Sequence, residues 1–249
     1  MTLAQNQTMI ITGASRGIGR ALALDLAGRG VNIVVNARSA DKIEEVAGQC
    51  RDLGVQADFV AGDAADTSAC GAMVQKALEI GNFYGFVHAA AVLRPGPLVY
   101  EISPEDFDAV LSQVHAAHRI TAAAYPRLLE RGEGLVVYFG SGAAKIAQPG
   151  IGAYCAAKAA MHHLMRVVAA EHKEITCLAY RPGIVDTRMQ ERARESKGGG
   201  ASELHKIFRT WKEKGELISP EKSAGVLADL MTGDPNRFHG EVADVDDLI

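Results

Sequence analysis

Short runs of apolar, β-branched residues alternate along the chain with longer helical patterns. Seven runs are predicted strands: Thr8–Thr12, Val31–Asn36, Ala57–Ala61, Gly85–Ala89, Leu135–Phe139, Thr176–Tyr180 and Glu241–Val245. Between them lie six predicted helices: Gly17–Arg29, Ala40–Leu53, Thr67–Ile80, Pro104–Leu129, Ile151–His172 and Pro220–Met231. Strands and helices that alternate at this spacing indicate βαβ units.

Several of the predicted strands are apolar at nearly every position, as in 33–35 and 135–137. Strands buried on both faces have this composition because helices cover both sides of a parallel sheet. We therefore expect an α/β fold with one Rossmann-like, doubly wound parallel sheet of about seven strands and helices on both faces. The chain has 249 residues and shows neither a linker nor a repeat, which predicts one domain over residues 1–249.

One segment interrupts the alternation of strands and helices. Residues 184–215 are mostly polar and contain Lys197-Gly198-Gly199-Gly200 just before the last predicted helix. Consecutive glycines do not fix a backbone conformation. We therefore expect a mobile substrate flap at about residues 184–215.

Charge and composition argue against several classes of protein. The net charge is −4, and Lys and Arg are dispersed rather than clustered, which argues against a nucleic-acid surface. No apolar run reaches the roughly 18–20 residues of a membrane span, and Met1–Gln7 is too short and polar for a secretory signal. The four cysteines lack Cys-x-x-Cys spacing, which favours buried, reduced thiols and a cytoplasmic location.

A glycine-rich loop, Thr12–Gly19, follows the first predicted strand and opens the first predicted helix. A helix N-terminus offers unpaired N–H groups, and glycines let a pyrophosphate approach the backbone closely. A plain tight turn is the alternative, but the strand-turn-helix context favours a dinucleotide site. The residues expected to contact the cofactor here are Gly13, Ser15, Arg16, Gly17, Ile18 and Gly19.

The end of the second predicted strand reads Asn36-Ala37-Arg38-Ser39 and lacks an acidic residue. An acid at this place would bind a ribose 2′-hydroxyl, whereas an arginine accepts a 2′-phosphate. Arg38, with Arg16 from the glycine loop, therefore favours NADP(H) over NAD, although both arginines could simply be solvated. Asp63, after the third strand, could accept from the adenine amino group or cap a helix.

Tyr154 and Lys158 are four residues apart in a predicted helix, which puts both side chains on one face. An ammonium beside a phenol stabilises the phenolate and lowers the tyrosine pKa, so that the phenol can transfer a proton near neutral pH. Ser141 follows the fifth predicted strand directly, at a carboxyl end of the sheet, where ligands of such folds bind. By itself Ser141 would be a turn serine between two glycines.

These motifs, together with Arg181-Pro182-Gly183, resemble the short-chain dehydrogenase/reductase family in order and spacing over roughly Thr8 to Val245. The resemblance implies hydride transfer between NAD(P)H and a carbonyl or alcohol. It further implies that Ser141 hydrogen-bonds the substrate carbonyl, that Tyr154 is the general acid, and that Lys158 binds ribose hydroxyls while lowering the Tyr154 pKa.

The resemblance also implies that Pro182, Gly183, Ile184 and Thr187 meet the nicotinamide. The chain departs from the family pattern at two places. His88-Ala89-Ala90-Ala91 replaces Asn-Asn-Ala-Gly, although Ala90 can still line the cofactor. No asparagine occurs between Glu105 and Arg131, so the usual water-holding residue is missing near Gln113 and His115, to which we assign no role.

Within the family, the motifs look most like those of sepiapterin and benzil reductases. An apolar wall of Met189, Phe208 and Trp211 could receive an aromatic substrate, although apolar helix residues are more often core. Asp244 matches the pterin-anchoring acid by its place near the C-terminus, and a solvated acidic tail is its alternative. No metal site is expected, because no acid or cysteine joins His115 and His118 at zinc-like spacing.

The sequence thus predicts an NADPH-dependent carbonyl reductase that acts on a small ketone or dicarbonyl, such as an aryl diketone or a pterin side chain. An NADP-dependent alcohol dehydrogenase working in the oxidative direction uses the same groups and stays open. A non-catalytic NADP(H)-sensing protein is a third possibility, but it has no need of Ser141, Tyr154 and Lys158 together. By resemblance we expect a homodimer or homotetramer formed through Pro104–Leu129 and Ile151–His172.

Overall fold

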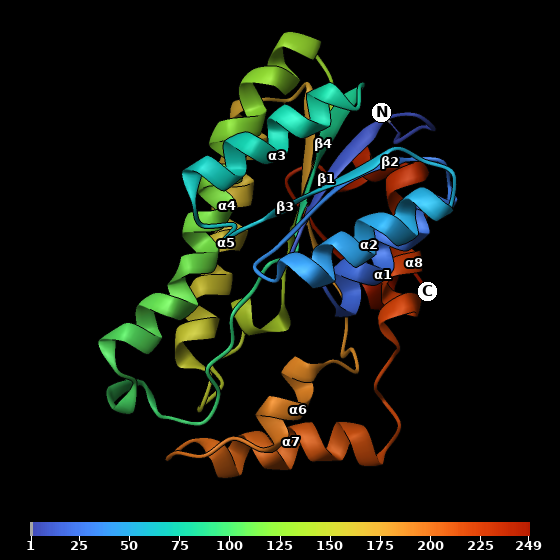
Figure 1. Cartoon of the computed structure of the whole chain (residues 1–249). Coiled ribbons are helices and arrows are strands. Elements are labelled where there is room, and N and C mark those ends of the chain that lie inside the picture. Colours follow the sequence, from blue (N-terminus) through green and yellow to red (C-terminus); the bar gives the residue numbers. More distant parts are fainter. Residues whose placement is uncertain (1) are drawn as a thin grey trace.

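A seven-stranded, wholly parallel sheet runs through the molecule (Figure 1). The computed structural model describes residues 2–249. The strands lie in the order β3-β2-β1-β4-β5-β6-β7. Their bounds are β1 (Thr8–Thr12), β2 (Asn32–Ala37), β3 (Ala57–Ala61), β4 (Phe83–His88), β5 (Gly134–Phe139), β6 (Ile175–Arg181) and β7 (Val242–Asp244).

Helices cover both faces of this sheet. One layer holds α1 (Gly17–Gly28), α2 (Ala40–Asp52) and α8 (Pro220–Thr232), and the other holds α3 (Thr67–Glu79), α4 (Pro104–Arg131) and α5 (Gly152–Glu171) (Figure 1). Successive residues of a strand pack against opposite helix layers: the Ile11 side chain packs toward α1 and α8, whereas the Ile10 side chain packs toward α3 and α4. This alternation explains why β1 is buried at every position, and it confirms the predicted doubly wound sheet.

The strand order reverses beside β1. The chain runs outward from β1 to β3 and then crosses back to form β4 on the other side of β1. The connections that leave β1 and β4 therefore separate, and such a reversal in strand order is where α/β folds form a ligand crevice, at the carboxyl ends of the two strands. Ligands of open α/β sheets bind at such a point, so the fold places any cofactor site beside Thr12 and His88.

Two helices occupy the segment expected to be a flap: α6 (Arg188–Arg194) and α7 (Ala201–Glu213). They extend beyond one end of the sheet (Figure 1, lower part). Neither helix was predicted from the sequence, although Leu204, Phe208 and Trp211 recur at positions i, i+4 and i+7 of α7.

The flap is held at its base and at its glycine run. Val185 and Ile218 form an isolated parallel bridge, with Asp186 N donating to Ile218 O at 2.9 Å. A second attachment joins the glycine run to the body, because Gly200 N donates to Gly96 O at 2.8 Å. Within residues 2–249, none of the helices combines the length and apolar character that crossing a bilayer requires.

Candidate active site

The glycine-rich loop between β1 and α1 forms a close-packed cradle. Gly13 has φ +69°, and a Cβ atom there would lie 2.7 Å from the backbone of Ala90 in the loop that follows β4. A Cβ at Gly19 would lie 2.7 Å from the Gly13 carbonyl oxygen. Helix α1 begins at Gly17 without a side-chain cap, so its first N–H groups are available to an anion. The shape and the donors both fit a dinucleotide pyrophosphate.

Arg16 and Arg38 are exposed at the rim of this cradle. Burial lowers the pKa of Arg16, and the charges of Arg188, Arg192 and Arg38 lower it further. Guanidinium groups gathered in this way fit a phosphate dianion. Asp63 uses Oδ1 to accept a 2.8 Å hydrogen bond from Ala65 N, so this carboxylate shapes its own turn, and an adenine contact stays a prediction.

Helix α5 carries Tyr154 and Lys158 one turn apart, as the spacing predicts. The Lys158 side chain is 1% exposed, and its Nζ donates to the Phe139 carbonyl oxygen at 2.8 Å. The same Nζ lies 5.5 Å from the centroid of the Tyr154 ring. Lys158 thus links the helix that carries the tyrosine to the end of β5.

Burial raises the pKa of Tyr154 to about 12, while a side-chain hydrogen bond with Ser141 acts in the opposite direction. Burial also lowers the pKa of Lys158 to about 7. The expectation that the lysine charge lowers the tyrosine pKa is therefore not met in this structure. The reason is geometric: the ammonium is directed to a backbone carbonyl, and removal of the phenol from water dominates.

Ser141 lies just after β5 and begins a short 3-10 helix, Gly142–Ala144, whose Ala143 N donates to Ser141 Oγ at 3.2 Å. The backbone N–H of Ser141 donates to His162 Nε2 at 3.4 Å. A Cβ at Gly140 would lie 2.5 Å from the same ring nitrogen, which explains the glycine at this position. His162, on α5, thus supports the backbone that positions the serine.

His88, at the end of β4, replaces an asparagine of the family pattern and is fully buried. Its Nε2 lies 3.1 Å from the Gln113 carbonyl oxygen, which can only accept, so Nε2 carries the proton. Nδ1 therefore accepts from Thr12 Oγ1 at 3.0 Å, and that hydroxyl accepts from Ala90 N at 3.2 Å. Burial lowers the pKa of His88 to about 3, which keeps the ring neutral.

Gln113 and His115, the two residues near the missing asparagine, differ in their surroundings. Gln113 is 2% exposed, and its Nε2 donates to Val110 O at 2.7 Å and to Val92 O at 3.3 Å. Its Oε1 is buried without a hydrogen-bond partner in the described chain. His115 is exposed and lines a hollow formed by α3, α4 and α5. Gln113 is thus the one that faces the interior.

The segment after β6 approaches the cradle. Gly183 has φ +78°, and a Cβ there would lie 2.6 Å from Val245 Cγ1, so only glycine fits. Ser223 Oγ donates to Pro182 O at 2.9 Å, and Ile184 O accepts from Ile218 N at 2.9 Å. The Thr187 methyl would lie 3.6 Å from a Cβ at Gly17, which brings the start of α6 to the start of α1.

An apolar cluster adjoins Tyr154. Leu93, Ala143, Ile151 and Leu204 form its buried part, and Met189, Phe208 and Cys155 pack against it with the tyrosine. The Trp211 ring lies 4.8 Å from the Phe208 ring, centroid to centroid. The structure therefore packs Met189 and Phe208 of the expected apolar wall against the cluster beside Tyr154, whereas Trp211 is joined to it through Phe208. Leu93 and Leu204 belong to the same cluster and were not predicted from the sequence.

Asp244 has a protein partner of its own. It is 5% exposed, forms an ion pair with Arg181 at the neighbouring end of β6, and accepts from Asp246 N at 3.2 Å. Asp244 is therefore not part of a solvated acidic tail, and its carboxylate is already engaged within the protein. Substrate binding by Asp244 stays a prediction.

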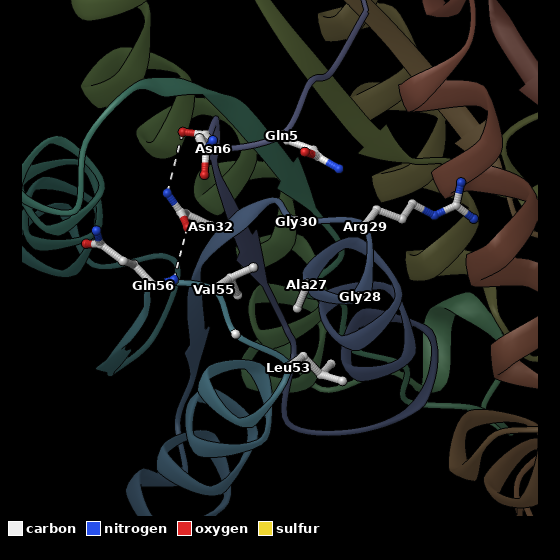
Figure 2. Close-up of a pocket in the computed structure, with 11 residues that line it drawn as sticks. Gln5, Asn6, Ala27, Gly28, Arg29, Gly30, Asn32, Leu53, Val55 and Gln56 are labelled. Carbon is white, nitrogen blue, oxygen red and sulfur yellow. Dashed lines mark hydrogen bonds between the residues drawn. The ribbon is translucent and has the colours of Figure 1, made fainter.

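The opposite edge of the sheet has a polar hollow of about 380 Å³ (Figure 2). The Asn32 side-chain amide binds the backbone on two sides: its Nδ2 donates to Asn6 O at 3.5 Å, and its Oδ1 accepts from Gln56 N at 3.0 Å. Its cation, Arg29, is paired with Asp25 and Asp229. In the described part of the chain, no cluster of three His, Cys, Asp or Glu side chains is placed to bind a metal.

A family model for short chain dehydrogenases matches residues 7–198. An NADPH-dependent pterin aldehyde reductase of Arabidopsis thaliana is 29% identical over 226 residues, which cover 88% of this chain and 90% of the relative.

Two crystal structures have the same fold. The KRED1-Pglu enzyme, at 24% identity, superposes with a TM-score of 0.86 over 95% of this chain and 100% of its own. A protein of Beutenbergia cavernae, described as an NAD(P)-dependent gluconate 5-dehydrogenase, has a TM-score of 0.84 and 26% identity and covers 98% of this chain and 96% of its own. That structure contains bound NADP at low occupancy.

Proposed function

The chain belongs to the short-chain dehydrogenase/reductase family of oxidoreductases, and from this premise we propose that it is an NADPH-dependent carbonyl reductase. The observation that carries the proposal is the group formed by Ser141, Tyr154 and Lys158 at the carboxyl edge of the sheet, on the side where the glycine cradle opens. Two hydroxyls that converge on one oxygen stabilise the negative charge that carbonyl reduction builds there.

The proposed cofactor is NADP(H). Gly13, Gly17 and Gly19 leave room for the pyrophosphate, and Arg16 with Arg38 would bind the 2′-phosphate. Two comparisons support this choice: the Arabidopsis relative is an NADPH-dependent reductase, and the similar Beutenbergia structure contains NADP. When bound, NADPH supplies the hydride that reduces the carbonyl carbon.

Tyr154 is the proposed proton donor. Its raised pKa keeps the phenol protonated at neutral pH, and the protonated form is the one that reduction of a carbonyl requires. Ser141 would hold the same substrate oxygen through its hydroxyl. Oxidation of an alcohol would use the same phenol as its phenolate, so the dehydrogenase alternative is separated by the direction of turnover in the assay described below.

Lys158 is proposed to bind the cofactor ribose while it stays attached to the Phe139 carbonyl oxygen. Pro182, Gly183, Ile184 and Thr187 would border the nicotinamide, and Ala90 would line the cofactor from the loop after β4. Ser15 and Ile18 complete the proposed phosphate contacts, because they lie in the same turn as the glycines.

The proposed substrate is a small, apolar or aromatic carbonyl compound. Met189, Phe208 and Trp211 provide an apolar and aromatic surface close to Tyr154, contributed by the flap. Rings bind well against such surfaces through area burial and offset stacking. The pterin aldehyde reductase among the relatives makes an aromatic heterocycle with an aldehyde or dicarbonyl side chain the first class to test.

The test is an NADPH-consumption screen over pterin aldehydes, aryl diketones, quinones and simple ketones, with NADH run in parallel. We expect oxidation of NADPH with at least one aryl carbonyl class. Reduction of NADP+ with alcohols and no reaction with any carbonyl would support the dehydrogenase alternative. Tight NADPH binding with no turnover in either direction would support a sensing protein.

We also propose a homo-oligomer that pairs through α4 and α5. These two helices pack on each other along one side of the sheet (Figure 1). A hollow of about 670 Å³ follows their outer surface, lined in part by Val114, Ala123 and Leu164. Apolar helix surfaces of this kind are usual at subunit contacts.

A further inference from the structure

The start of α6 in the flap lies against the start of α1. Thr187 is the residue before α6, and its methyl would lie 3.6 Å from a Cβ at Gly17. An arginine adjoins each side of this contact: Arg16 precedes Gly17, and Arg188 follows Thr187. Arg192 is one turn along α6 and therefore shares a face with Arg188.

The arginines at this contact lack acidic partners in the part of the chain that the structure describes. Arg29, Arg94, Arg127, Arg131 and Arg181 each form an ion pair with a carboxylate. Over residues 2–249, no such pair reaches Arg16, Arg38, Arg188 or Arg192. Other arginines of the described chain also lack an ion pair, but here several guanidinium charges act on one another at one place, in a chain whose net charge is −4.

The guanidinium groups also repel one another. Burial is the largest cause of the lowered pKa of Arg16. The positive charges of Arg188, Arg192 and Arg38 lower it further, in decreasing order of size. The two flap arginines thus act on Arg16 more strongly than Arg38 does. Like charges gathered at one place destabilise the arrangement unless an anion lies between them.

We propose that Arg188 and Arg192 are the flap's half of a phosphate clamp, which closes with Arg16 on the phosphates of the dinucleotide held in the glycine cradle. The proposal rests on the proposed NADP(H) function. The contact at Gly17 indicates that these arginines bind the cofactor phosphates and not the substrate. A pyrophosphate binds at the first turn of α1, whereas a substrate oxygen would lie at Ser141 and Tyr154. Guanidinium groups bind phosphate oxygens in pairs.

The clamp couples cofactor binding to the position of the flap. Helix α7 follows α6 and is attached to it, since Arg209 Nη2 donates to Arg194 O at 3.2 Å and His205 Nε2 lies 3.0 Å from Ser196 O. Trp211 and Phe208 lie on α7. A phosphate that holds α6 would therefore also hold the aromatic wall beside Tyr154. Trp211 is the chain's single tryptophan, so its fluorescence reports on the flap.

The experiment compares the double variant Arg188→Ala/Arg192→Ala with the wild type. NADP+ and NAD+ are titrated without substrate, by calorimetry and by Trp211 fluorescence, at low and high salt. We expect NADP+ to bind roughly tenfold or more weakly to the double variant at low salt, with a smaller difference at high salt. Arg188→Lys/Arg192→Lys keeps the charges and should keep most of the affinity.

The matched control is Lys212→Ala/Lys214→Ala, which removes two positive charges from the end of α7 that do not act on Arg16. It should bind NADP+ as the wild type does. If the double alanine variant loses affinity for both dinucleotides, the clamp binds the pyrophosphate. If it loses affinity for NADP+ alone, the clamp binds the 2′-phosphate. Either result supports the clamp. Unchanged NADP+ affinity in the folded alanine variant would overturn the clamp. A wild type that binds no NADP+ would contradict the proposed function instead.

Discussion

Tyr154 is the residue at which opposing electrostatic influences meet. Burial raises the pKa of its phenol to about 12, and the hydrogen bond with Ser141 lowers it. A phenol in this state is a stable proton reservoir at neutral pH. It becomes a good acid only when negative charge develops on an oxygen that it already contacts. The site thus holds the proton in place rather than releasing it to water.

Replacement of this phenol tests its role directly. Tyr154→Phe removes the proton and one donor to the substrate oxygen while keeping the ring in the apolar cluster. We expect turnover to fall by a factor on the order of 10² or more, with NADPH affinity nearly unchanged. Steady-state kinetics and cofactor titration measure the two effects. Full turnover in the variant would remove Tyr154 from the mechanism.

Arg38 tests the choice of cofactor. Arg38→Ala removes a guanidinium proposed to meet the 2′-phosphate, a group that NADH lacks. We therefore expect the variant to lose much more affinity for NADPH than for NADH, and titration of both dinucleotides measures the ratio. Equal losses would mean that the arginine acts on a part of the cofactor common to both.

Lys158 makes stability depend on pH. Burial lowers its pKa from 10.5 to about 7. Between these values the unfolded chain binds a proton that the folded chain does not, so the free energy of unfolding rises with pH across this window. The destabilisation by the buried charge is therefore complete below about pH 7 and fades toward pH 10.5.

Lys158→Met should raise the unfolding free energy of the ligand-free protein, on the order of a few kcal/mol below pH 7 and progressively less toward pH 10. Thermal or urea unfolding at a series of pH values measures the difference. Lys145→Met, at an exposed lysine, is the control and should have no such pH-dependent effect. A stabilisation that stays constant with pH would show that packing, and not charge, is responsible.

Much of the site is visible in the sequence at the level of residues. The order of the glycine loop, Ser141, Tyr154 and Lys158 was enough to predict which side chains meet at one edge of the sheet. The direction of the Lys158 ammonium was not visible, because it depends on where the Phe139 carbonyl lies. The hydrogen bonds of His88 and His162 join residues far apart in the sequence, so no local sequence pattern predicts them.

At the scale of elements, strand-helix alternation predicted the sheet but not the helices of the flap. Helix α6 has only seven residues, too few for a clear apolar repeat. The glycine run 198–200 suggested mobility, yet its glycines serve a close approach between backbones. A Cβ at Gly198 would lie 2.7 Å from the Gly96 carbonyl carbon, and one at Gly200 would lie 2.5 Å from Gly150.

This contact between two loops predicts that a single methyl group can displace the flap. Gly96 has φ +122°, and a Cβ there would meet the Lys197 carbonyl oxygen. Gly96→Ala should therefore raise the KM for the carbonyl substrate several-fold, as the aromatic wall shifts, and cost about 1–3 kcal/mol of stability. Kinetics and thermal unfolding measure the two effects.

Gly215→Ala is the matched control for Gly96→Ala. Gly215 lies in the flap and, like Gly96, has a positive φ (+68°), but a Cβ there would meet no atom within 4 Å. Backbone strain of about 1 kcal/mol is thus expected in the control without a change in KM. If the two variants raise KM equally, the loop contact does not determine the position of the flap.

At the scale of the whole molecule, the outer faces of α4 and α5 carry apolar side chains that could form a subunit contact. Ala160, Leu164 and Val167 lie at helical spacing along α5, and Val167 is 42% exposed. Leu164 also lines the hollow that follows α4. Apolar groups arranged in a row across two packed helices provide a continuous surface of the kind that a second copy can cover.

We therefore expect the wild type to have a mass in solution of two or four times 26.4 kDa, measured by light scattering coupled to size exclusion. Val167→Arg places a charge in the proposed contact and should shift the mass toward the monomer, because a buried and unpaired charge is costly. Leu78→Arg is the control, since Leu78 on α3 is similarly exposed at 40%. A monomeric wild type, or equal masses for the two variants, would rule out pairing through α5.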